Sequence, residues 1–216
     1  MKIEPMNNNR VFLSGTVESA PKFSHETFGE AFYDVMLLVP RLSNHLDRVP
    51  VTVSEKLLSG GKFEVGKYVC IKGQFRSYNK IEENKSKLML TVFVREVCDF
   101  EEDMNPNIIE ITGYICKEPT YRTTPFNREI CDCLIAVNRA YNKSDYLPCI
   151  AWGRNAKFVS DLDVGSKVNI VGRIQSREYQ KHLDSGETIS RIAYEVSINK
   201  IQIDEQETIK QEEQLS

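Results

Sequence analysis

Hydrophobic positions in residues 108–203 follow the two-residue alternation and the short apolar runs that are typical of β-strands. One stretch departs from this pattern, because Ala156, Val159 and Leu162 are spaced as on one face of a helix, which ends at Gly165. The predicted strands cover 108–115, 130–137, 147–152, 167–179 and 189–203. The pattern therefore predicts five strands with a single short helix between the third and the fourth.

The same arrangement occurs twice along the chain. The segment 90–97 matches 194–201, and seven glycine, proline, aspartate and arginine positions recur at a slightly shorter interval. The recurring pairs are Gly15 and Gly113, Pro21 and Pro119, Asp34 and Asp132, Arg41 and Arg139, Pro50 and Pro148, Gly66 and Gly165, and Gly73 and Gly172. Matches that keep their order in this way indicate an internal repeat of about 95 residues.

The two copies meet in the acidic segment 100–107, which contains Pro106. We expect a first domain at 8–101, a linker at 102–107, a second domain at 108–203 and an acidic disordered tail at 204–216. Five strands with one helix after the third strand is the layout of an OB-fold. The expected fold class is all-β, with two tandem OB-fold, five-stranded Greek-key barrels that each carry one short helix.

Composition and charge narrow the function classes. The chain is 41% hydrophobic and 27% charged, with a net charge of −3, as expected of a globular protein. Its pI near 5.8 argues against a highly basic, histone-like nucleic-acid coat. The tail 204–216 holds much of the negative charge, so the body before it need not repel a polyanion. No apolar run has the length of a membrane span and the N-terminus lacks the apolar core of a secretory signal, so we expect a cytoplasmic, nucleoid-associated protein.

The residues that carry catalytic or metal chemistry form no recognisable set. The six cysteines include no CxxC motif and the three histidines are scattered, so we expect reduced thiols, no metal and no cofactor. Cys131 and Cys133 share a strand face and are expected to pack as small core side chains. No Lys-Ser/Thr follows the glycines at 60–61, and Asp34 and Asp132 each stand singly in a strand. We therefore expect a protein that is not an enzyme.

Aromatic and arginine side chains gather in the second copy. Tyr146 and Trp152 are an even number of residues apart and share one face of a regular strand, and Tyr141 lies just before them. Alternation along the fourth strand sends Ile170, Gly172 and Ile174 inward and the polar set outward. That outward set is Arg173, Gln175, Arg177 and Tyr179. Exposed rings among arginines suit unpaired nucleic acid, since every base offers a face for stacking and the guanidinium groups meet phosphates.

A structural interpretation is open for each of these residues taken alone. A lone Trp152 can be a core residue, Tyr179 can cap a barrel end, and Arg173 and Arg177 can form a solvated face. Only the combination of the residues favours a binding surface.

The second copy closely resembles the bacterial single-stranded DNA-binding protein family. The segments that carry the resemblance are GYICKEPTYR, LIAVNRAYNKSDYLPCIAWGRNAKFV and VGSKVNIVGRIQSREYQ, within about residues 107–203. In that family four aromatic positions stack DNA bases, and they correspond here to Tyr141, Tyr146, Trp152 and Tyr179. The resemblance also implies phosphate contacts at Arg122, Arg139, Arg154, Arg173 and Arg177.

The first copy departs from this pattern. The positions that correspond to Tyr141, Tyr146, Trp152 and Tyr179 hold Ser43, Arg48, Ser54 and Lys80. Arg76, Tyr78 and Lys80 still alternate on one face, so we expect auxiliary DNA contacts there. The family works with four OB-folds together, which implies a homodimer of this two-domain chain. Its members also recruit replication and repair proteins through an acidic tail with a Pro-Phe tip, and 204–216 is acidic but lacks that tip.

Three hypotheses follow for the function. The first is a protein that coats single-stranded DNA without sequence specificity in replication, repair or recombination. The second is a protein-interaction adaptor or replication-restart accessory factor with weak nucleic-acid binding, since OB-folds serve many purposes. The third is an RNA-binding module, because stacking does not distinguish the sugar.

Overall fold

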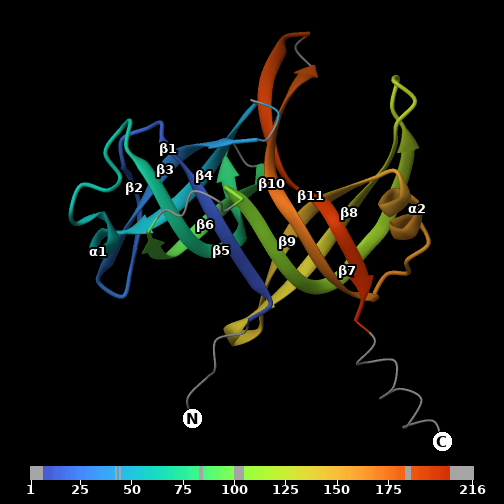
Figure 1. Ribbon diagram of the computed structural model, residues 1–216, viewed down its shortest axis with the longest axis horizontal. Helices are drawn as coiled ribbons and strands as arrows, with labels where there is room; N and C mark the ends of the chain where they lie inside the picture. The colour runs from blue at the N-terminus through green and yellow to red at the C-terminus, as the bar shows by residue number, and fades with distance from the viewer. Residues whose placement is uncertain are drawn as a thin grey trace, which may run out of the picture. The chain divides into compact units, whose positions relative to one another are not determined.

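Strands make up most of the computed structural model, which describes residues 7–41, 43, 45–82, 85–99, 105–182 and 186–204 (Figure 1). The strands are β1 (Asn9–Val17), β2 (Lys22–Thr27), β3 (Glu30–Pro40), β4 (Leu46–Ser54), β5 (Tyr68–Glu82), β6 (Lys85–Cys98), β7 (Asn107–Thr123), β8 (Glu129–Arg139), β9 (Lys143–Trp152), β10 (Lys167–His182) and β11 (Thr188–Ile203). The helices are α1 (Glu55–Leu58), the 3₁₀ turn η1 (Ala140–Asn142) and α2 (Arg154–Ser160). The predicted all-β fold with one short α-helix in each repeat is confirmed.

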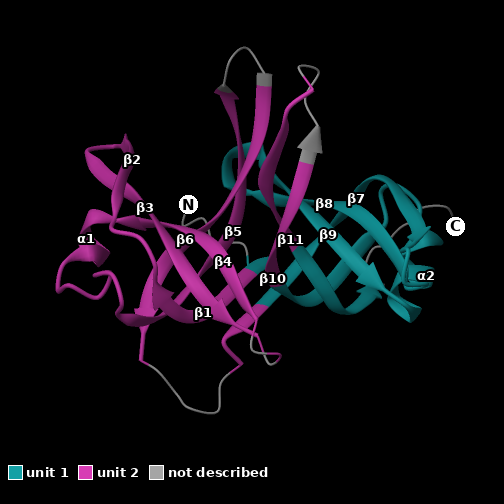
Figure 2. Ribbon diagram, turned by 90° about the horizontal axis from the view of Figure 1, so that it is seen from above, with its two compact units in different colours: residues 1–9, 109–173, 196–216 teal, residues 10–108, 174–195 magenta. Residues whose placement is uncertain are grey.

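The chain forms two compact units, which Figure 2 colours separately. The C-repeat unit consists of residues 1–9, 109–173 and 196–216, and the N-repeat unit of residues 10–108 and 174–195. The second segment of the N-repeat unit, 174–195, is the far end of the β10–β11 hairpin and is called the hairpin arm below. The second sequence repeat therefore supplies a hairpin to the compact unit of the first, while the predicted domain boundaries stay a prediction.

The strands of the N-repeat unit close into a barrel. β1 pairs with β3 and β5, β5 pairs with β6, β6 runs parallel to β4, and β4 returns to β3. β2 extends the sheet beyond β3. Fully buried aliphatic and aromatic side chains fill the interior, including Leu13, Leu37, Val51, Ile71, Phe75 and Val92. This closed order of five strands is that of an OB-fold, which leaves no long sheet edge unpaired.

The C-repeat unit repeats the same order. β7 pairs with β8 and β10, β8 pairs with β9, β9 runs parallel to β11, and β11 neighbours β10. The helix predicted between the third and fourth strands is α2, which follows Gly153 and ends five residues before Gly165. Cys131 and Cys133 are buried, as expected of small core side chains. The two tandem barrels expected from the repeat are thus present.

The recurring glycines mark the places where strands approach most closely in each barrel. A Cβ on Gly15 would lie 2.4 Å from the Leu38 carbonyl oxygen, and one on Gly113 would lie 2.6 Å from the Ala136 oxygen. At Gly73 the corresponding distance to the Phe93 oxygen is 2.4 Å. Any larger residue would push two backbones apart, which explains why glycine stands at these positions of both copies.

Candidate nucleic-acid interface

The outer face of β9 displays Tyr146 and Trp152. Their side chains are 46% and 39% exposed, and β9 pairs with β8 without a register shift along its whole length. The odd-numbered positions between them are buried; they are Leu147, Cys149 and Ala151. Both rings therefore lie on one face, about 20 Å apart along the strand. The prediction that these two residues share an exposed face is confirmed.

Tyr141 lies in the 3₁₀ turn η1 that leads into β9, and it is 83% exposed. Its backbone adopts the left-handed region, with φ 63° and ψ 36°. This conformation is uncommon for an aromatic residue and costs conformational energy, so it persists where the surrounding structure requires it. The turn presents the Tyr141 ring to solvent in the same unit as Tyr146 and Trp152.

A row of side chains crosses the sheet beside Tyr146. The register pairs Lys167 of β10 with Tyr114 of β7, Tyr114 with Ala136 of β8, and Ala136 with Tyr146. The Lys167 ammonium lies 5.9 Å from the centre of the Tyr114 ring and 3.3 Å from an Asp204 carboxylate oxygen. Tyr114, half-buried, adds a ring to the same sheet face. Sequence reasoning missed Tyr114, because only the strand register shows that it lies in line with Tyr146.

A second row places an arginine beside Trp152. Arg122 of β7 pairs with Ile130 of β8, and Ile130 pairs with Trp152. The Arg122 Nε atom also donates to Asp132, at 2.8 Å, in an ion pair whose two side chains are about half exposed. A pair this exposed contributes little to stability, so the guanidinium can exchange its carboxylate partner for a phosphate at low cost.

Two further arginines of the C-repeat unit that were expected to contact phosphate, Arg154 and Arg139, differ from each other. Arg154 is exposed at the start of α2, and its side chain makes no hydrogen bond or ion pair with the described residues. Arg139 instead lies 3.4 Å from Asp145, whose carboxylate is fully buried. Arg139 thus compensates a buried charge, and the equivalent pair in the first repeat, Arg41 and Asp47, has the same arrangement.

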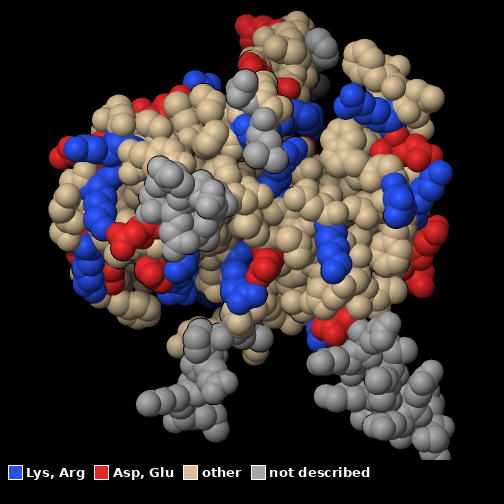
Figure 3. All heavy atoms as spheres, in the orientation of Figure 1, with Lys and Arg blue, Asp and Glu red and all other residues tan. Residues whose placement is uncertain are grey.

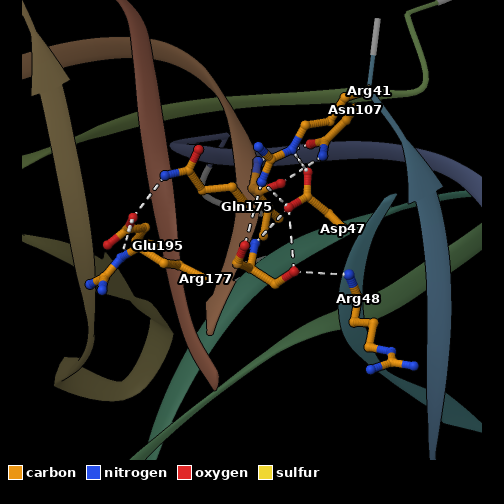
Figure 4. A network of polar contacts seen from close by, with 9 residues as sticks. Arg41, Asp47, Arg48, Asn107, Gln175, Arg177 and Glu195 are labelled. Atoms are coloured by element: carbon orange, nitrogen blue, oxygen red, sulfur yellow. Dashed lines mark hydrogen bonds and ion pairs between the residues drawn. The ribbon is translucent and has the colours of Figure 1, made fainter. Parts of the chain in front are cut away.

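Arg173 is half-buried in the C-repeat unit, whereas Arg177 and Tyr179 lie on the hairpin arm of the N-repeat unit. The Arg177 guanidinium lies 5.8 Å from the centre of the Tyr179 ring, and its Nε is 3.7 Å from the Glu195 carboxylate. Gln175 is buried and donates to the same carboxylate, at 2.7 Å (Figure 4). Because Tyr179 and the other three predicted stacking residues belong to different units, a single surface formed by all four stays a prediction.

Hydrogen bonds fix the base of the hairpin arm within the N-repeat unit (Figure 4). The buried Asp47 accepts from Arg41 Nε at 2.6 Å and from the Ser176 backbone N–H at 2.7 Å. Asn107 accepts from the Ile174 N–H at 2.9 Å and donates to the Ile174 carbonyl at 2.7 Å. The arm that carries Arg177 and Tyr179 is therefore anchored by Asp47 of the first sequence repeat and by Asn107 at the start of β7.

The auxiliary set, Arg76, Tyr78 and Lys80, lies on the outer face of β5. The Arg76 guanidinium is 4.0 Å from the centre of the Phe93 ring on β6. Tyr78 is 45% exposed, and partial burial together with the nearby Asp34 carboxylate raises the pKa of its phenol. Lys80 is exposed near the end of the strand. Phe93, which the sequence did not indicate, turns this face into a mixed aromatic and cationic surface.

Charged side chains do not gather into one continuous basic stripe on the face shown in Figure 3, where Asp and Glu lie between the Lys and Arg side chains. Affinity for a polyanion would therefore depend on stacking and on individual arginines rather than on a uniformly positive surface. Within the described ranges, no cluster of three or more His, Cys, Asp or Glu side chains could hold a metal ion. No helix of that part of the chain is long and apolar enough to cross a membrane. The acidic tail lies outside the described residues beyond Asp204.

Solved structures share the whole architecture. The wild-type single-stranded DNA binding protein from Thermus aquaticus superposes with a TM-score of 0.66 over 91% of this chain and 92% of that one, at 21% sequence identity. A likeness at this identity establishes the tandem OB-fold. The function of this chain has to be argued from its own residues.

Curated proteins are similar in sequence to about a third of this chain. Single-stranded DNA-binding protein 1 of Staphylococcus aureus (strain COL) is 33% identical over 81 residues, which are 34% of this chain and 48% of that protein. Single-stranded DNA-binding protein A of Bacillus subtilis (strain 168) is 31% identical over 81 residues, 34% of this chain and 47% of that protein. The chain thus spans about half the length of these curated relatives. Residues 106–204, a little under half of the chain, match the model of the Single-strand binding protein family.

Proposed function

We propose that the protein binds single-stranded DNA without sequence specificity and protects it during replication, repair or recombination. The observation that carries this proposal is the outer face of β8 and β9, where Tyr146 and Trp152 are exposed in line and Arg122 lies in the same row as Trp152. Aromatic rings stack on bases of any sequence, and arginines neutralise phosphates. The names of the sequence relatives support the same ligand.

The binding mode needs no catalytic group or cofactor. Tyr141, Tyr146, Trp152 and Tyr179 supply stacking surfaces, and Arg122, Arg154, Arg173 and Arg177 supply phosphate contacts. Arg139 serves chiefly to compensate the buried Asp145 carboxylate, because its guanidinium already faces that charge. On this proposal the protein is a non-enzymatic coat of unpaired strands in the cytoplasm.

A homodimer, which brings four OB-folds together, is part of the proposal. The two barrels of the chain support this arrangement, since the family that the second repeat resembles works with four OB-folds together. Light scattering after gel filtration should give about twice the 24.8 kDa of the chain. A mass of one chain at micromolar concentration would contradict the dimer and leave the DNA-binding proposal intact.

Trp152 is the single tryptophan of the chain and provides a direct test. Adding oligo-dT should quench its emission, and the observed affinity should fall with salt at a log–log slope of about −0.7 for each neutralised phosphate. Unchanged emission at low salt and saturating oligo-dT would refute the proposal.

Substitution makes the test specific to the sheet face. Trp152→Ala should weaken binding of a labelled oligo-dT by about 1–3 kcal/mol, measured by fluorescence anisotropy. Phe158→Ala is the matched control, since Phe158 is also an aromatic residue of the C-repeat unit with 37% exposure, but it lies on α2. Equal losses in the two variants would show that the effect is not caused by stacking on β9. Parallel titrations with oligo-rU distinguish DNA from RNA preference.

A further inference from the structure

The first repeat carries a cluster of rings and cations on the outer face of its barrel. His25 of β2 stacks on Phe32 of β3, with ring centres 5.0 Å apart and planes 11° apart. Phe32 lies 5.4 Å from Phe93 of β6. The guanidinium groups of Arg76 and Arg95 lie 4.0 Å and 5.1 Å from the centre of the Phe93 ring. These five residues, here called the Phe93 cluster, all belong to the N-repeat unit.

The Phe93 cluster uses different positions from those of the second repeat. Where the second repeat has Trp152 at the end of β9, the first has Ser54, and the pairing strand carries Phe32 opposite Ser54 in the register. Phe93 in turn corresponds to Ser197, which is a small buried residue in the second repeat. The aromatic surface of the first repeat has thus shifted across neighbouring strands, so a comparison of equivalent positions does not reveal it.

The cationic part of the cluster suits an anion. Arg76 and Arg95 both donate to the side-chain oxygen of Gln74, at 2.9 Å and 3.4 Å, which holds two positive groups close together. Within the described residues, Arg95 makes no ion pair with a carboxylate. The first repeat has Thr91 at the position of Glu195. It therefore lacks the carboxylate that faces Arg177 on the hairpin arm. Two adjacent guanidinium groups repel each other, and a phosphate beside them would relieve that repulsion.

Two flat groups of the cluster, an exposed imidazole and a half-buried guanidinium, lie on aromatic rings. His25 is exposed and rests on Phe32, and Arg76 rests on Phe93. Imidazole rings and guanidinium planes both stack on unpaired bases. The phenylalanines, half-buried beneath them, hold these groups flat at little cost in side-chain entropy.

We propose that the Phe93 cluster is a second binding site for unpaired nucleic acid, in which bases stack on His25 and Arg76 and a phosphate binds Arg95. The proposal rests on the proposed function for the class of ligand, and it adds a site in the first repeat that does not depend on the stacking residues of the second.

A reporter within the cluster separates the two sites. In a Trp152→Phe background, Phe93→Trp provides the sole tryptophan of the chain, backed by Arg76 and next to Phe32. Saturating oligo-dT should quench this emission, and an oligo-rU titration shows whether DNA or RNA is the better ligand. If neither oligonucleotide changes this emission, the inference is wrong, and a protein partner becomes the alternative ligand of this face. If Trp152 of the natural protein still responds in that case, the proposed function stands.

Two exposed substitutions test the contacts without disturbing the core. In the reporter protein, His25→Ala and Arg95→Gln should each weaken oligo-dT binding by about fivefold or more, and Arg95→Gln should reduce the log–log salt slope by about 0.7. The matched controls are His45→Ala, an exposed histidine of the same repeat, and Lys72→Gln, an exposed cation of β5, which should stay within about twofold. Quenching that survives both test substitutions unchanged would overturn the assignment, since the reporter would then be sensing DNA bound elsewhere. Phe93→Leu in the Trp152→Phe background removes the ring while keeping an apolar side chain. This variant has no tryptophan, so its affinity is measured by anisotropy of a labelled oligo-dT, and it should lose at least as much affinity as His25→Ala in the same background.

Discussion

The anchor of the hairpin arm gives the sharpest stability prediction. Asp47 is fully buried and receives two hydrogen bonds from the Arg41 guanidinium, at 2.6 Å and 2.5 Å, and one from the Ser176 backbone at 2.7 Å. The hydrogen bonds that Arg41 donates to Asp47 raise the pKa of Arg41, so the cation persists at any ordinary pH. Asp47→Ala would leave this guanidinium half-buried with no carboxylate, and the Ser176 N–H without its acceptor.

The expected cost of Asp47→Ala is about 3–5 kcal/mol in the free energy of unfolding, because removing one member of a buried ion pair leaves the other charge uncompensated. Asp47→Asn keeps an oxygen for Ser176 and loses the charge, so it should fall between the natural protein and Asp47→Ala. The exposed ion pair between Glu18 and Arg48, at 2.8 Å, provides the control, and Glu18→Gln should cost less than about 1 kcal/mol.

Urea denaturation measures this cost as a shift of the midpoint at constant slope. Hydrogen exchange adds a local measurement, since the Ser176 amide should lose more protection in Asp47→Ala than amides of the C-repeat core. Oligo-dT affinity should also fall, because the arm carries Arg177 and Tyr179. A loss of stability equal to that of Glu18→Gln would refute the reasoning, as would unchanged exchange at Ser176.

Three further predictions concern the fold. Asn107→Ala should destabilise the protein by about 2–4 kcal/mol in urea denaturation, because both backbone groups of Ile174 lose a buried partner; unchanged protection of the Ile174 amide would contradict this. Gly15→Ala should lower the melting temperature by several degrees, since the new Cβ would overlap the Leu38 carbonyl oxygen. An unchanged melting temperature would show that the two strands can move apart at little cost. Burial raises the pKa of the Cys131 thiol to about 11, so only about one in a thousand of these thiols is ionised at pH 8. Mass spectrometry should therefore find Cys131 unmodified after alkylation of the native protein at pH 8 and modified once it is unfolded; rapid native labelling would contradict its burial.

Much of the fold could be predicted from the sequence, because it depends on local rules. A residue-by-residue alternation fixes which side chains face the barrel, so Tyr146 and Trp152 could be placed on one outer face before their neighbours were known. The recurring glycines could be found as well, since Gly15 and Gly113 meet the same steric requirement in each copy. Rings and arginines that share strands also favoured unpaired nucleic acid as the ligand, which is the proposal that the binding experiments test.

The neighbours across strands could not be predicted in the same way. Alternation identifies a face, but the register decides which residues of other strands lie beside one another on that face. Tyr114 lies in the row of Tyr146, and Phe93 lies between Phe32 and Arg76. Both arrangements depend on the pairing of strands that are distant in the sequence. The ion pair of Arg139 with Asp145 was likewise not indicated by the sequence, while the expected phosphate contact of Arg139 stays a prediction.

The sequence by itself determined the duplication, the strand order of each barrel and the residue types available for stacking. Only the tertiary structure decided that residues 174–195 join the compact unit of the first repeat, anchored by Asp47 and Asn107. The physical reason is that repeats and alternation are written in the spacing of residues along the chain. A buried carboxylate or amide, in contrast, forms hydrogen bonds with backbone groups that come within about 3 Å of it only when the chain folds.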